Sequence, residues 1–276
     1  MFRLTTHTFF LRISAVLLVL LSACNAPADL PTPVPAEATS NSPATEAPTQ
    51  PPTEEPAGGA VTVTVDVSRV AQEITSQVVE AVPPAADHPW WEAMPQHTLL
   101  TLQGYPISDH LMKAQIFVYP VEGLSVNEVA GQVPGSLQTL LQSQQAGESM
   151  PYLPPYNAAQ VMHAQVKFLD FKNGSGVRYL TQFDQAVIPI NNYELHYTYQ
   201  GLTSDGKYYV AAVLPVNLPG LPADGNVDLD NPPAGFMEDF PKYLADTVNM
   251  LDGGDASAFT PDLSALDATM GSLEIK

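Results

Sequence analysis

The chain has 276 residues, a net charge of −19 at pH 7 and an apolar fraction of 45%. This charge argues against nucleic acid, whose phosphates would repel the protein, and against a basic face that docks on anionic lipid headgroups. Cys24 is the only cysteine, so the chain cannot form an intramolecular disulfide.

The first residues have the features of a secretory signal. Arg3 and Arg12 stand around the start of an apolar run, residues 13–21, which is interrupted only by Ser14. The run is shorter than the roughly 20 apolar residues that a spanning helix needs. The pattern therefore predicts that residues 1–23 are an export signal, which is removed. Its removal takes away two bases and no acid, so the net charge would change from −19 to −21.

The residues at the end of this run, Leu21-Ser22-Ala23-Cys24, resemble the lipobox of bacterial lipoproteins. In that family the cysteine sulfur carries a diacylglycerol, the signal is cut before it, and the new amine is often acylated too. The resemblance implies a lipid-anchored protein of the cell envelope, held outside the cytoplasm by acylated Cys24. Two or more acyl chains hold a protein stably on a bilayer. An ordinary signal peptide with an accidental cysteine is the alternative.

A tether follows the anchor. After Cys24, the residues up to 59 are mostly Pro, Thr, Ala, Ser and Glu, without apolar periodicity. Such a composition cannot bury enough apolar surface to offset the entropy of ordering. Prolines favour extended polyproline II, so residues 24–59 are predicted to be a disordered, semi-stiff spacer that could reach on the order of 100 Å.

The remaining residues, 60–276, are predicted to form a single domain, which begins with a helix, a strand pair and a second helix. Apolar residues recur at helical spacing in 67–78, and strands are expected at 99–104 and 114–119. A capping box from Ser125 to Glu128 opens a helix at 125–141, which Pro134 should kink or split.

Four strands with short turns then predict an antiparallel meander at 162–168, 177–187, 193–200 and 207–216. In the first of these strands, Met162, Ala164, Val166 and Phe168 are expected to share the buried face. In the third, Tyr193, Leu195, Tyr197 and Tyr199 share one face, opposite Glu194, His196, Thr198 and Gln200. Helices at 239–251 and 260–270 and a short strand at 273–275 complete the chain.

This element order predicts an α+β fold, an antiparallel sheet covered by helices on one face. The order is similar to that of the PsbP/Mog1-like fold. The stretch between Gly176 and Val210 also resembles uncharacterised bacterial surface lipoproteins, a likeness that implies no activity.

Signals of catalysis are weak. The sequence has no Gly-x-Ser-x-Gly elbow and no closely spaced histidine pair, and its one thiol belongs to the lipobox. A secreted hydrolase built from distant residues, for example around His163 or His196, is the enzymatic alternative. A serine or aspartate within hydrogen-bond reach of either histidine would favour it.

An oxygen-rich stretch is a candidate calcium site. Asp224, Asn226, Asp228 and Asp230 place oxygen atoms at alternate positions, as calcium loops do. The stretch is not an EF-hand, because Leu229 stands where the glycine belongs and Gly235 where the bidentate glutamate belongs. An irregular calcium site and an ordinary solvated loop remain the two interpretations.

Aromatic residues are a candidate ligand-binding surface. Trp90, Trp91, Tyr197 and Tyr199 could provide rings for a protein or saccharide ligand, although a tyrosine stripe is also typical of a sheet's core face. The sequence therefore favours a non-enzymatic lipoprotein with a binding, scaffolding or assembly role. A hydrolase and a calcium-stabilised binding module are the alternatives.

Overall fold

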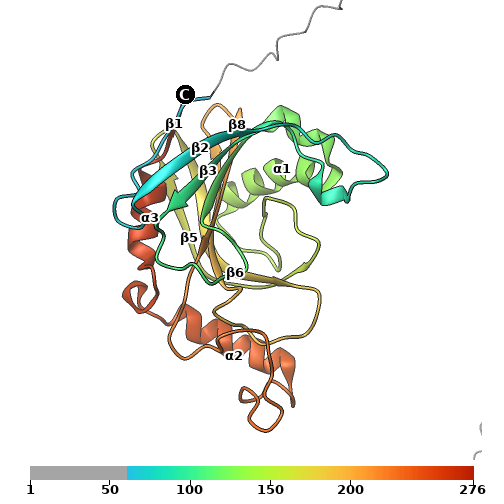
Figure 1. Cartoon of the computed structure of the whole chain (residues 1–276), viewed down its shortest axis with the longest axis vertical. Helices are drawn as coiled ribbons and strands as arrows, with labels where there is room; N and C mark the ends of the chain where they lie inside the picture. The colour runs from blue at the N-terminus through green and yellow to red at the C-terminus, as the bar shows by residue number, and fades with distance from the viewer. Residues whose placement is uncertain (1–60) are drawn as a thin grey trace, which may run out of the picture. The chain divides into compact units, whose positions relative to one another are not determined.

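The core of the protein is a seven-stranded antiparallel sheet. The computed structural model describes residues 61–276, all of which belong to one compact unit. The expected signal, the lipidation of Cys24 and the tether lie outside the described residues. The strands follow the spatial order β2-β3-β4-β8-β7-β6-β5, in which every neighbouring pair is antiparallel (Figure 1).

The strands of the sheet occur in two groups along the chain. The first group is β2 (Glu73–Val79), β3 (His97–Gln103) and β4 (Gln115–Pro120). The second is the meander β5 (Ala159–Phe171), β6 (Gly174–Asp184), β7 (His196–Thr203) and β8 (Tyr208–Pro215). The last meander strand pairs with β4, which joins the two groups. The predicted strand pair, the meander and the α+β class are therefore confirmed.

Helices cover both faces of this sheet, so the prediction of helices on one face is wrong. On one face lies α1 (Glu128–Ser143), and on the other lie α2 (Phe240–Asp252) and α3 (Leu263–Gly271) (Figure 1). The central strands are buried on both sides: in β8, Ala212 packs towards α2 and α3, while Ala211 packs towards α1. A strand with two buried faces needs two covering layers.

The chain ends meet in a second, two-stranded sheet. The strand β1 (Val63–Thr64) pairs with β9 (Glu274–Ile275) over the face that carries α2 and α3. This confirms the short closing strand predicted at 273–275. Within residues 61–276, three short 3₁₀ turns lie between the larger elements: η1 (Trp90–Glu92), η2 (Val121–Val126) and η3 (Ala256–Ala258).

The predicted helix at 67–78 is wrong. Val67–Val70 forms a single turn, and the chain then enters β2, in which Ile74 pairs with Leu102. The β-branched residues of this stretch suit a pleated strand, and pairing with β3 decides the outcome over local helical spacing. The later helix is confirmed with two changes: Asn127, not Ser125, caps α1, and the helix continues through Pro134.

A β-bulge changes which side chains of β5 are buried together. The pairing of β5 with β6 shifts between Ala164 and Lys167, and Gln165 adopts a φ of 56°. Met162 and Ala164 therefore face α2 and α3, whereas Val166 and Phe168 pack on the α1 side. The predicted common face for these four residues is wrong, because a bulge inverts the alternation.

Candidate functional site

The four aromatic residues proposed from sequence do not form one surface. Tyr197 and Tyr199 are fully buried, where their hydroxyls donate to Asp267 Oδ1 at 3.1 Å and to Leu169 O at 2.9 Å. Trp90 is 46% exposed on the opposite side of the sheet, and Trp91 beside it is partly buried. The tyrosines therefore belong to the core, and Trp90 is the ring that faces solvent.

The oxygen-rich loop between β8 and α2 is exposed. Asp224, Asn226, Asp228 and Asp230 all lie at the surface. Two of these side chains are used in local turns, since the amide of Asn226 donates to Asp224 Oδ1 and that of Asp230 to Asp228 Oδ1. Within residues 61–276, no group of three or more His, Cys, Asp or Glu residues is arranged to hold a metal ion.

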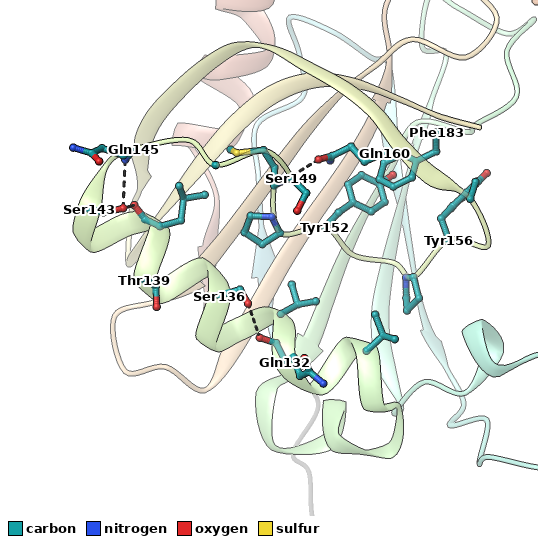
Figure 2. A pocket seen from close by; sticks show the side chains of 18 of the residues that line it. Gln132, Ser136, Thr139, Ser143, Gln145, Ser149, Tyr152, Tyr156, Gln160 and Phe183 are labelled. Atoms are coloured by element: carbon teal, nitrogen blue, oxygen red, sulfur yellow. Dashed lines mark hydrogen bonds between the residues drawn. The ribbon is translucent and has the colours of Figure 1, made fainter. Parts of the chain in front are cut away.

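A groove on the α1 side of the sheet is the strongest candidate for a binding site (Figure 2). It lies between α1 and the segment 145–160, with the end of β6 at one extremity, and its volume is about 540 Å³. Its lining residues are Trp90, Val129, Gln132, Val133, Ser136, Thr139, Leu140, Ser143, Gln145, Gly147, Ser149, Met150, Pro151, Tyr152, Pro155, Tyr156, Ala158, Gln160 and Phe183.

The lining of the groove combines apolar and polar groups and carries no charge. None of the nineteen residues is Asp, Glu, Lys, Arg or His, although the chain has 29 acidic residues and 10 basic ones. Hydroxyl and amide groups provide the polarity, and aromatic rings provide much of the apolar surface. This combination suits a ligand that offers hydrogen bonds without a net charge.

One wall of the groove is held to the sheet by a buried amide. Gln200 Oε1 accepts from Leu153 N at 3.0 Å and from Tyr209 Oη at 2.7 Å. Its Nε2 donates to Leu153 O at 3.1 Å and to Thr198 Oγ1 at 2.7 Å. All the principal hydrogen-bonding positions of this amide are therefore used, and Leu153 is fixed through both of its backbone groups.

Two further side chains fix the neighbouring backbone. Tyr179 Oη donates to Pro151 O at 2.7 Å, and Met150 N donates to Gln160 Oε1, also at 2.7 Å. The wall made by residues 150–153 thus has a defined position although it contains no helix or strand.

The aromatic end of the groove is anchored by a histidine. Tyr152 lies 4.4 Å from Phe183 between ring centroids, and Tyr156 lies 5.7 Å from Phe183. Behind them, His196 Nδ1 is 2.9 Å from Glu194 O, and His196 Nε2 is 3.1 Å from Tyr152 Oη. A carbonyl oxygen only accepts, so Nδ1 carries the proton and Nε2 accepts from Tyr152.

The charge state of His196 agrees with this arrangement. Burial lowers the pKa of His196 to about 4, so the ring is neutral at physiological pH. The bond to Glu194 O holds the ring of His196, and its Nε2 positions Tyr152. His163 and His196 do not form a pair. His163 on β5 and His196 on β7 both lie opposite Thr181 of β6, so the strand β6 separates them.

The cap of α1 fixes another part of the groove lining. Asn127 Oδ1 accepts from Val129 N and from Ala130 N, both at 3.0 Å, and so caps the helix. Its Nδ2 donates to Trp90 O at 2.7 Å. One buried side chain therefore starts the helix and fixes the turn that carries Trp90.

A second hollow of the surface is acidic. It includes Asp109, Glu194 and Asp224, together with Asn226 from the candidate calcium loop. Burial, followed by the hydrogen bond and negative charge of Asp184, raises the pKa of Glu194 to about 7. Glu194 therefore changes charge near neutral pH.

Comparison of the chain with protein-family models, with curated proteins and with solved structures finds no significant match. The resemblances to the PsbP/Mog1-like fold and to bacterial lipoproteins therefore stay predictions. Within residues 61–276, no helix has the length and apolar character needed to cross a bilayer.

Proposed function

We propose that this protein is a lipid-anchored, extracytoplasmic binding protein that holds an uncharged ligand in the groove between α1 and the segment 145–160. The anchor rests on the order Leu21-Ser22-Ala23-Cys24 behind a short apolar run. The tether at 24–59 would place the folded domain within a chain's reach of the membrane.

The observation that carries the binding role is the uncharged lining of the groove. A strongly acidic chain repels anions over its whole surface and attracts cations. A site without carboxylate, histidine, lysine or arginine side chains selects instead by shape, hydrogen bonds and aromatic contact. The rings of Trp90, Tyr156 and Phe183 in the lining give such a ligand apolar surface to cover.

A binding role fits this groove better than catalysis does. General acid–base chemistry needs a group that gains or loses a proton near the working pH, usually histidine or a carboxyl group. The lining offers only tyrosines for this purpose, and burial raises the pKa of both Tyr152 and Tyr156. The nearest histidine, His196, is committed to holding Tyr152.

The groove can be tested through its own tryptophan. The chain has two tryptophans, so Trp91→Phe leaves Trp90 as the single reporter. We expect an uncharged polar ligand to change the emission of Trp90 and to raise the melting temperature of the mature chain. Tyr156→Ala should abolish the response, while Tyr193→Ala, which removes an exposed tyrosine away from the groove, should leave it unchanged.

The anchor has a separate test. Mass spectrometry of the mature protein should show an acylated Cys24 as the first residue. Release of the chain into the medium with a free thiol on Cys24 would contradict the anchoring without bearing on the groove.

A further inference from the structure

We infer that the ligand of the groove is a neutral saccharide chain, an inference that rests on the proposed function and narrows it. The first support is a row of hydroxyl groups on α1. Ser136, Thr139 and Ser143 all line the groove and are exposed on the helix surface. Their spacing of three and four residues places them along one face of the helix, over roughly 10 Å.

Each of these hydroxyls donates its hydrogen to a backbone carbonyl of α1. Ser136 Oγ donates to Gln132 O at 3.2 Å, and Thr139 Oγ1 donates to Gly135 O at 3.0 Å. Ser143 Oγ likewise donates to Leu140 O at 3.2 Å. What Ser136 and Thr139 present to the groove is therefore their lone pairs, whereas Ser143 Oγ also accepts from Gln145 N at 3.4 Å and has less acceptor capacity left. A row of acceptors without charge calls for a ligand with several donors and no charge, as a polyhydroxylated chain is.

Donors are available from amide side chains. Gln132 and Gln145 are exposed at the groove, and their amides can both donate and accept. Gln160 also lines the groove; its Oε1 is taken by Met150 N, while its Nε2 is buried and has no partner within the described residues. A buried amide hydrogen without an acceptor is costly, so a ligand oxygen would bind favourably once the Gln160 amide turns its Nε2 towards the groove.

Aromatic rings complete the complementarity. A sugar ring has a polar edge of hydroxyls and an apolar face of C–H groups, and that face packs well on an aromatic ring. Trp90 offers a ring that is 46% exposed, and Tyr156 offers a partly buried ring. Because Tyr152 Oη is engaged by His196, that residue also presents mainly its ring.

An extended peptide fits less well, because recognition of peptides draws largely on main-chain hydrogen bonds. On one wall, the main chain of α1 is bonded within the helix. On the other wall, Met150 N, Pro151 O and both backbone groups of Leu153 are bonded to side chains of the protein. The groove therefore offers side-chain hydroxyls, amides and rings rather than a free main chain.

The test is a titration of the mature chain with three sets of probes. The first set is neutral oligosaccharides: cellohexaose, maltohexaose, mannohexaose and chitohexaose. The second is uncharged hexapeptides of Ser, Asn and Gly, and the third is anionic oligogalacturonate. We expect a neutral oligosaccharide to bind, and the other two sets to fail under the same conditions.

Variants then assign the binding to the groove. We expect Trp90→Ala and Tyr156→Ala each to weaken the oligosaccharide at least about tenfold, as loss of a stacked ring should. Thr139→Val keeps the shape and removes one acceptor, so it should weaken binding by about 2- to 10-fold. Thr75→Val on β2, distant from the groove lining, is its matched control and should have no effect. Melting temperatures establish that each variant is folded.

The outcomes separate the two proposals. Binding of the uncharged peptides alone, with the same dependence on Trp90 and Tyr156, would overturn the saccharide inference and leave the proposed function standing. Binding of oligogalacturonate alone would overturn the inference of a neutral ligand. If all three groove variants bind the saccharide as tightly as the wild type does, the saccharide does not bind in this groove. Failure of every probe would count against both proposals.

Discussion

The replacement Gln200→Leu should detach the groove wall, residues 150–153, from the sheet. Leucine has nearly the size of glutamine but cannot make hydrogen bonds. The change would leave three buried groups without their partner: Leu153 N, Leu153 O and Tyr209 Oη. Thr198 Oγ1 is less affected, because it keeps its bond to Ala212 O at 2.8 Å.

The expected cost follows from these three groups. Each buried group left unsatisfied costs about 1–3 kcal/mol, which gives roughly 3–9 kcal/mol before any relaxation. Water that enters as the segment 150–153 lifts away would satisfy some of them, so we expect a net loss of about 3–5 kcal/mol. Because small domains are stable by only about 5–15 kcal/mol, the loss should be a large part of the total.

Urea denaturation measures this loss, and amide hydrogen exchange at Leu153 locates it. The control is Gln138→Leu, an exposed residue of α1, which should change stability by less than about 0.5 kcal/mol. A loss below about 1 kcal/mol for Gln200→Leu, with unchanged exchange at Leu153, would refute the account of how this wall is held.

Three further results are expected. The raised pKa of Glu194, about 7, means that the folded state binds a proton more tightly, so stability should fall as pH rises from about 4.5 to 7. Glu194→Gln should remove this slope and be more stable than wild type at pH 8, as comparison of urea midpoints across pH will show. Tyr152→Phe leaves His196 Nε2 without a donor and should cost about 1–3 kcal/mol by urea denaturation. If the loop holds calcium, adding calcium raises the melting temperature and Asp228→Ala removes the increase. If neither calcium nor Asp228→Ala changes the melting temperature, the loop is not a calcium site.

The elements of the fold were largely accessible from sequence, because short-range patterns specify them. The meander has alternating side chains and turn residues between its strands, and its four strands were all found. The edge strand β2 was missed, because its apolar spacing also suits a helix and only its pairing with β3 decides. The bulge at Gln165 was missed for a similar reason: its backbone N–H donates to Asp252 and its side-chain amide donates to Leu251 O, both in α2 and 86 or more residues away in sequence.

The candidate site was much less accessible. Only Trp90, among the four aromatic residues proposed, lies in the groove. The polar residues of β7 were assigned to the face opposite the tyrosines, but His196, Thr198 and Gln200 are fully buried there. Nothing in the sequence states that this polar face will hold the backbone of residues 150–153 rather than water. The partners of a buried amide become visible only when the fold is known.

The most direct test of the central claim is a crystal structure of the mature chain with the tightest-binding uncharged probe. The account predicts that the ligand lies between α1 and the segment 145–160, with one ring against Trp90 and an oxygen atom within hydrogen-bond distance of Gln160 Nε2. A ligand found in the acidic hollow beside Glu194 and Asp224, with the groove empty, would contradict it.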